Sequence, residues 1–222
     1  MRVIGVIRIS DAFAEFCRGP VEQAAAFCDG ICFVTNNVTR SEVFAAMNSC
    51  PNVLVSKETQ SPWSHYTSIR DAYELGIAQK ADWVIIPDHD EILPYEQLAA
   101  EIRKADDLGK MVVSFPFLNC WNSPLTIVAP SLNFTGDHGK AFKAGIQDFR
   151  ESGFCIPEGY WDSISACRHP LRHCNMMTEM LRARRLKERG SIEPWAEYEP
   201  KTFPFIPGWT IEDYQQEESR CR

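Results

Sequence analysis

Length, composition and charge limit the class of protein before any motif is considered. The chain has 222 residues, 45% of them hydrophobic, and a formal net charge of −7. This is enough for one well-filled core and argues against a broadly basic nucleic-acid binder. Arg8 interrupts the first apolar run and no stretch reaches the length of a membrane span, so neither a secretory signal nor a span is predicted. The nine cysteines are odd in number and several lie in apolar segments, which favours free thiols and a cytoplasmic location.

Strands and helices are predicted to alternate through the first half of the chain. Short runs rich in Val and Ile predict buried strands, whereas apolar residues three and four apart predict helices with one packed face. The predicted strands span 2–9, 31–34, 53–55, 83–86 and 111–118, and the predicted helices span 20–27, 41–50, 64–77 and 95–108. Because such alternation joins parallel strands through crossover helices, it predicts an α/β fold.

Polar residues follow several of the predicted strands. Ser10 and Asp11 come after the first strand, and Asn36 comes after the second. Ligands of open α/β sheets bind at the carboxyl ends of the strands, so these three residues are candidate contacts for a nucleotide. Arg70 lies near the start of the third predicted helix, where it can face the same edge or pair with Glu74 one turn later.

The stretch Trp83–Leu93 carries the strongest functional signal. A buried strand there ends in three acids within four positions, Asp88, Asp90 and Glu91. Residues two apart on an extended chain point the same way, so Asp88 and Asp90 can face one ligand while His89 faces away. Carboxylates held so close repel unless a cation neutralises them, which indicates a divalent metal site. The simpler interpretation is a solvated acidic turn before the next helix.

The second half of the chain has a looser pattern. Prolines and glycines break 119–165 into loops and short strands, and a basic helix is predicted over 175–188. Beyond that helix, the tail combines four prolines with aromatic residues, which predicts a strap packed on the body and a disordered end from Asp213. Lys140 and Lys143 are expected on a flexible loop, either facing ligand phosphates or in solvent.

Two cysteines and two histidines lie within Cys167–Cys174, the one cysteine cluster that could bind zinc. A structural zinc site normally draws ligand pairs from two separated loops. No second Cys/His pair with that spacing is evident in the sequence, so zinc is a minor alternative.

The order of elements over residues 70–91 resembles the core of family-2-type glycosyltransferases. A helix that carries Arg70 near its start leads through Asp82 and Trp83 into an apolar strand and an Asp-x-Asp-Glu motif over 88–91. The resemblance implies a GT-A fold, a single α/β domain with a mostly parallel central sheet and a looser C-terminal half. The implied division is a catalytic domain over 1–190, made of a nucleotide-sugar-binding half (1–118) and an acceptor half (119–190), and a strap and tail over 191–222.

The same resemblance implies roles for individual residues. The donor would be a UDP- or GDP-linked sugar, and Asp90 and His173 would bind Mn²⁺ or Mg²⁺, with Asp88 on the ribose or, through water, on the metal. The simpler interpretation of His173 is that it caps a following helix. An inverting transfer needs a base that takes a proton from the acceptor hydroxyl. Glu158 is the preferred candidate for that base, and Glu91, which more often supports the metal loop, is the second.

Three functions remain open on the sequence. The leading one is a glycosyltransferase whose acceptor is a saccharide or, through the basic helix, a base in DNA. A nucleotidyltransferase would use paired aspartates and a metal in a similar way, but no glycine-rich phosphate loop follows the first predicted strand. The third is a saccharide- or nucleic-acid-binding module without catalysis, which the basic segment 182–189 near an aromatic tail favours.

Overall fold

A seven-stranded sheet lies at the centre of the part of the chain that the computed structural model describes. The described residues are 1–11, 14–59, 65–130, 138–146, 149–150, 156–157, 163–174, 183 and 200–221. The strands of the sheet are β1 (Val3–Ser10), β2 (Gly30–Asn36), β3 (Val53–Glu58), β4 (Trp83–Ile85), β6 (Val112–Phe115), β9 (His138–Lys143) and β12 (Ile164–Ala166). Their spatial order is β12-β6-β9-β4-β1-β2-β3.

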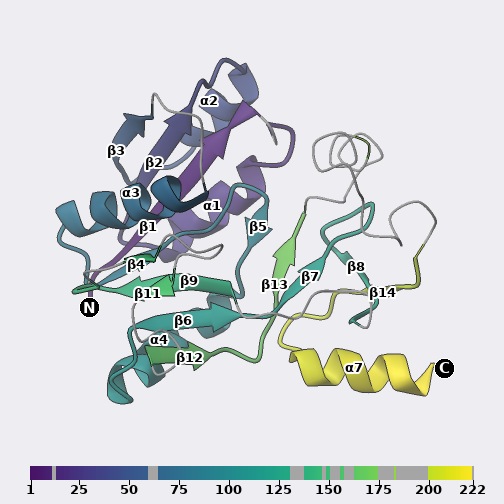
Figure 1. Ribbon diagram of the computed structural model, residues 1–222. Helices are drawn as coiled ribbons and strands as arrows, with labels where there is room; N and C mark the ends of the chain where they lie inside the picture. Colours follow the sequence, from purple (N-terminus) through teal and green to yellow (C-terminus); the bar gives the residue numbers. More distant parts are fainter. Residues whose placement is uncertain are drawn as a thin grey trace.

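The strands of this sheet run parallel except for β9 (Figure 1). β1 pairs parallel with β2 and β4, and the outer strands β3 and β12 pair parallel with β2 and β6. β9 lies between β4 and β6 and pairs antiparallel with both. The predicted α/β fold with a mostly parallel central sheet is therefore confirmed.

Helices cover both faces of the sheet. The helices are α1 (Arg18–Phe27), α2 (Ser41–Asn48) and α4 (Tyr95–Asp107) on one face and α3 (His65–Ala78) on the other. Alternate residues of β1 enter the two layers, so Ile7 packs in the first and Ile4 in the second. A Cβ atom on Gly76 of α3 would lie 2.6 Å from a methyl group of Val84, which explains why glycine occupies this position.

A group of shorter strands lies beside the central sheet (Figure 1). β13 (Leu171–His173) lies between β5 (Glu91–Ile92) and β7 (Phe117–Asn119). The two remaining pairs are β8 (Thr126–Val128) with β14 (Thr202–Pro204), and β10 (Phe149–Arg150) with β11 (Ile156–Pro157). Phe203 of β14 and Tyr214 of α7 (Ile211–Arg220) pack against Leu118 and Ile127, so the described part of the strap does pack on the body.

Two elements differ from the expectations. The predicted strand 111–118 is two strands, β6 and β7, which belong to different sheets. Pro116 separates them because it has no N–H to donate to a sheet ladder. The end of the chain from Asp213 is helical rather than disordered, because Thr210 and Asp213 form a reciprocal capping box at the start of α7. The predicted helix 175–188 lies outside the described residues, apart from 183.

Candidate functional site

The three acids of the sequence motif lie in a tight turn after β4. The turn closes through a hydrogen bond from Glu91 N to Asp88 O (3.0 Å), and Glu91 Oε2 in turn accepts from Asp88 N (2.9 Å). Asp88 forms a parallel bridge with Arg8 of β1. The motif therefore lies at the carboxyl end of β1 and β4, the edge where the sequence predicts a ligand site.

Two buried cations neutralise part of this acidic turn. Arg8 forms an ion pair with Asp88. Lys140 of β9 contacts two of the acids, because its Nζ atom lies 3.2 Å from Asp88 Oδ2 and 2.6 Å from Glu91 Oε2. Arg8, Lys140 and Glu91 are each 5% exposed. Lys140 was expected on a flexible loop, and this expectation is wrong, since the residue lies in a central strand and is bound to acids of the motif.

The electrostatic environment of this network shifts the pKa of its members. Burial raises the pKa of Glu91 and outweighs the opposing attraction of Lys140. Burial lowers the pKa of Lys140, but Asp88 and Glu91 together raise it further, so the net shift is upward. Lys140 is therefore held in its charged form.

Asp90 faces a different partner from Asp88 and Glu91. His173 Nε2 lies 3.4 Å from Asp90 Oδ2, and His173 Nδ1 lies 3.2 Å from Asn119 Oδ1. The pairing follows from strand register, because His173 lies opposite Glu91 on one side and Asn119 on the other. Asn119 Oδ1 can only accept, so His173 Nδ1 carries a proton and donates to it, which leaves Nε2 as the ring atom that faces Asp90.

His173 also affects the pKa of Asp90. Burial raises the pKa of Asp90, whereas charge attraction and hydrogen bonding from His173 lower it, and the net shift is downward. Asp88, Asp90 and Glu91 carry three negative charges against the two permanent positive charges of Arg8 and Lys140. The remaining negative charge is at Asp90, which faces the imidazole of His173 and also lies near His89.

The donor set at Asp90 fits a hard divalent cation that a substrate helps to hold. Among the described residues, no group of three or more His, Cys, Asp and Glu side chains could enclose an ion. Mg²⁺-type sites in nucleotide enzymes commonly use one or two protein ligands and complete the shell with substrate phosphates and water. Asp90 and His173 would supply two ligands to such an ion, and the hydrogen bond between His173 and Asn119 is of the kind that usually orients a ligating histidine. The segment Cys167–Cys174 forms no zinc site within the described chain.

The nucleotide candidates at the strand ends make structural contacts. Asp11 accepts hydrogen bonds from the backbone N–H groups of Thr39 and Arg40 and from Thr39 Oγ1. Asn36 donates to the carbonyl and hydroxyl oxygens of Thr59 at 3.4 and 3.3 Å. Both residues thus tie neighbouring strand ends together at the edge that Ser10 also reaches. Their contact with a nucleotide stays a prediction.

Other predicted site residues have different outcomes. Arg70 Nε lies 2.9 Å from Glu74 Oε1, and both side chains are exposed, which is the helix-surface pairing that the sequence left open. Glu158, the preferred catalytic base, lies outside the described residues, as does the basic segment 182–189 apart from 183.

Sequence reasoning missed Arg8 as a site residue. The available signal was a charged residue inside an apolar strand, which requires an anionic partner.

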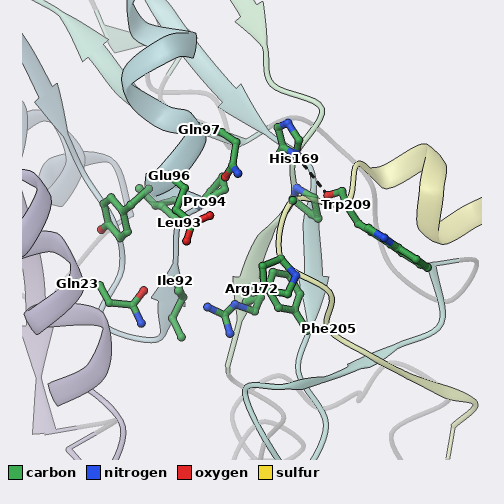
Figure 2. Close-up of a pocket in the computed structure, with 14 residues that line it drawn as sticks. Gln23, Ile92, Leu93, Pro94, Glu96, Gln97, His169, Arg172, Phe205 and Trp209 are labelled. Carbon is green, nitrogen blue, oxygen red and sulfur yellow. Dashed lines mark hydrogen bonds between the residues drawn. The ribbon is translucent and has the colours of Figure 1, made fainter.

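A separate pocket of about 150 Å³ lies close to this site (Figure 2). Its walls come from α1, the β5–α4 connection, β13 and the segment after β14. Ile92 and Arg172 line the pocket and lie opposite each other on β5 and β13. Side chains alternate along a strand, so the pocket lies on the face of this small sheet opposite Glu91 and His173.

Comparisons with known proteins identify the fold. No protein-family model matches the chain, and no curated protein matches it in sequence. Residues 1–349 of TarS from S. aureus superpose with a TM-score of 0.54 at 10% identity, covering 84% of this chain and 66% of that one. A longer TarS structure gives a TM-score of 0.53 at 9% identity over 84% of this chain. The chain spans only 40% of that longer structure.

A nucleotidyltransferase shares the fold as well. A 4-diphosphocytidyl-2C-methyl-D-erythritol synthase from Anaerococcus prevotii superposes with a TM-score of 0.51 at 8% identity, covering 81% of this chain and 92% of that one. TarS is a glycosyltransferase of the GT-A-like type. At these identities the likeness establishes a GT-A or nucleotidyltransferase-like fold. Within the described residues, no helix has the length and apolar character needed to cross a membrane.

Proposed function

We propose that the chain is a metal-dependent glycosyltransferase that moves a sugar from a nucleotide-sugar donor to an acceptor hydroxyl. The observation that carries this proposal is the pairing of Asp90 with His173, whose Nε2 and Oδ2 atoms are 3.4 Å apart. The pair brings a carboxylate and an imidazole, from segments far apart in sequence, to the carboxyl edge of a GT-A-like sheet. That edge is where nucleotides bind in open α/β folds.

The residues of the chain have distinct tasks in this proposal. Asp90 and His173 hold the ion, for which Mn²⁺ suits the imidazole better than Mg²⁺ does. Asn119 keeps the proton of His173 on Nδ1, so that Nε2 is available as a ligand. When bound, the ion offsets the negative charge that develops on a departing nucleoside diphosphate. Asp88, whose side chain is 26% exposed, reaches the ribose, and Ser10, Asp11 and Asn36 lie along the edge that receives the nucleotide.

The acids of the turn are not equivalent as bases. Glu91 is 5% exposed and bound to Lys140 at 2.6 Å, which suits it to hold the turn rather than to accept a proton from a substrate. Glu158 remains the preferred base in this proposal. An enzyme that inverts the sugar requires such a base close to the acceptor hydroxyl.

Nucleotidyl transfer is the second candidate, and the fold of the A. prevotii synthase favours it. The two reactions differ in their leaving group. A glycosyltransferase releases a nucleoside diphosphate from a nucleotide sugar, whereas a nucleotidyltransferase releases pyrophosphate from a nucleoside triphosphate. An assay of both products therefore separates the two functions on the same protein sample.

The test combines donor binding with product release. Calorimetry is performed with UDP- and GDP-linked sugars, with and without Mn²⁺; UDP-GlcNAc, with which the TarS fragment has been crystallised, belongs in the panel. We expect metal-dependent binding of one nucleotide sugar and slow release of its nucleoside diphosphate. Pyrophosphate release from CTP or UTP, with no nucleotide-sugar binding, would establish the second candidate. If the protein binds neither a nucleotide sugar nor a nucleoside triphosphate, both enzyme functions are contradicted. The function that then remains is the binding module without catalysis.

A matched pair of variants connects the activity to the motif. Asp90→Asn removes the ligating charge while keeping the shape of the side chain, and we expect it to abolish the Mn²⁺ dependence of donor binding. Asp107→Asn makes the same change at the exposed end of α4 and should behave as the parent. Equal donor binding and turnover by the two variants would show that the motif is not the metal site.

A further inference from the structure

The pocket in Figure 2 has no role in the proposed transfer reaction. Arg172 and His173 are consecutive residues of β13, but Arg172 lines the pocket and His173 faces Asp90. Their partners on β5 also point to opposite faces of this small sheet, since Ile92 lines the pocket and Glu91 binds Lys140. The pocket is therefore a second cavity, separated from the metal candidate by the thickness of one small sheet.

The size of the pocket limits its occupant to a single ring. Its volume is about 150 Å³, and an engineered cavity of roughly that volume in another protein binds one benzene molecule. Drug-sized ligands need pockets of about 300 Å³ or more. Gln23 and Glu96 are exposed and lie at its rim, whereas Arg172 is half-buried at its wall. A six-membered ring fits, and its substituents can extend past the rim.

The polar groups of the pocket favour a neutral, hydroxylated ligand. Glu96 offers acceptors, Arg172 offers donors, and Gln23 and Gln97 offer both. Because a carboxylate and a guanidinium line the same small space, a charged ligand would be attracted by one and repelled by the other. In Figure 2, Gln23 and Arg172 project toward each other across the pocket. Planar side chains of this kind can each bind two neighbouring hydroxyl groups.

Side chains at the wall of the pocket are held in place by their neighbours. The guanidinium of Arg172 lies 4.2 Å from the ring centre of Phe205 and donates to Pro124 O at 2.9 Å. Trp209 packs edge-on against Tyr214 at 5.0 Å between ring centres. Rings and polar groups that are already held in position reduce the entropy that a ligand loses on binding.

We propose that this pocket binds one pyranose unit of a neutral saccharide. The ring of the sugar packs on the apolar lining that Ile92, Leu93 and Pro207 provide, and its hydroxyl groups bond to Gln23, Glu96 and Arg172. The site is a binding subsite distinct from the transfer centre, and saccharide binding there requires neither a nucleotide nor a metal ion.

Ligand-observed NMR on the full chain tests the proposal. Saturation-transfer spectra are recorded with the methyl glycosides of glucose, galactose, mannose and GlcNAc, and with benzoate and benzylamine as charged rings of similar size. We expect at least one glycoside to bind with a Kd of about 1 mM, an affinity typical of a few hydrogen bonds and one apolar contact. Binding of neither glycoside nor charged ring, or preferential binding of benzoate or benzylamine, would overturn the proposal.

Substitutions at exposed positions test the location of the site, because they should not destabilise the folded protein. Gln23→Ala/Glu96→Ala should weaken glycoside binding by about tenfold or more, the loss expected when two hydrogen-bonding groups are removed. Glu22→Ala/Arg103→Ala changes exposed residues of the same two helices that do not line the pocket and should bind as the parent. Asp90→Asn should also bind the glycoside normally, so loss of the transfer function leaves this result intact. Equal binding by the two double variants would contradict the assigned location.

Discussion

At the scale of single residues, the candidate site depends on how three neighbouring acids are neutralised. Asp88 pairs with the buried cations Arg8 and Lys140, and Glu91 pairs with Lys140, whereas Asp90 is paired with an imidazole. Burying a charge destabilises the folded state unless an opposite charge compensates it. Removing one partner of a buried ion pair therefore leaves an uncompensated charge in the interior. The two sides of the turn should therefore respond differently to mutation.

Lys140 should be required for stability, and Lys143 should not. Lys140→Met leaves Glu91 without its cation in a buried position, so the free energy of unfolding should fall by about 3 kcal/mol or more. Lys143 lies on the same strand, but its side chain is 34% exposed and pairs with Asp106, so Lys143→Met should cost less than about 1 kcal/mol. Urea unfolding of both variants measures the difference. If both variants lose the same free energy of unfolding, the buried ion pairs of Lys140 stabilise the fold no more than the exposed ion pair of Lys143 does.

Asn119 should tune metal binding through His173. Asn119→Ala removes the acceptor that holds the proton on His173 Nδ1, and the affinity for Mn²⁺ should fall by about 10- to 100-fold, as for other outer-shell partners of metal ligands. Electron paramagnetic resonance of free Mn²⁺ gives the affinity directly. Asn48→Ala, at an exposed position of α2, is the control. If the Asn119 variant keeps the parental affinity, His173 is not a metal ligand.

At the scale of elements, most of the site is built by short connections at strand ends. The alternation of helices and strands could be predicted because each element carries its own periodic pattern. The pairing of Lys140 with Glu91 could not, because it depends on β9 entering the sheet antiparallel between β4 and β6, and no local pattern of residues 138–143 specifies that neighbour. His173 was predicted through the family resemblance, whereas its contact with Asn119 follows only from the register of β7 and β13.

The connection before α2 should weaken at acidic pH through Asp11. Although slight burial raises its pKa, hydrogen bonds from Thr39 and Arg40 lower it, and the net shift is downward. A carboxyl group whose pKa is lower in the folded state stabilises the protein above its unfolded pKa of about 3.9, and this contribution is lost as the pH falls through the folded value. The stability difference between the parent and Asp11→Asn should thus be present at neutral pH and disappear once the pH falls below the lowered pKa of Asp11 in the folded state. A difference that persists unchanged in acid would exclude this origin.

The C-terminal helix should depend on its capping box. Thr210→Ala removes the side chain that accepts from Asp213 N, and the local stability of α7 should fall by about 1 kcal/mol. Hydrogen exchange of the α7 amides reports this loss even where global unfolding does not. Ser219→Ala, at an exposed position in the same helix, should leave the protection unchanged. Faster exchange in both variants would assign the effect to the helix surface instead of the cap.

At the scale of the whole molecule, a bound ion should stabilise the fold against heat. A ligand that binds only the folded state at about a hundredfold its Kd adds roughly 2.7 kcal/mol, which corresponds to about 5–10 °C in Tm for a chain of this size. We expect this increase with Mn²⁺ in the parent and a much smaller one in Asp90→Asn. Differential scanning calorimetry with and without Mn²⁺ measures both. An equal increase in the two proteins would place the ion elsewhere.

The position of β9 between β4 and β6 also has a consequence for the order of folding. β9 follows both of its neighbours in the chain and lies between them, so β4 and β6 become part of one sheet only when β9 pairs with both. Contacts between residues so distant in sequence form slowly because long loops must close first. Until β9 pairs, Asp88 and Glu91 therefore lack the cation of Lys140, which contacts both of them in the folded structure. The edge that carries the candidate site is thus completed only when β9 pairs, and mutations in β9 should slow folding of the sheet while leaving the pairing of β1, β2 and β3 unaffected.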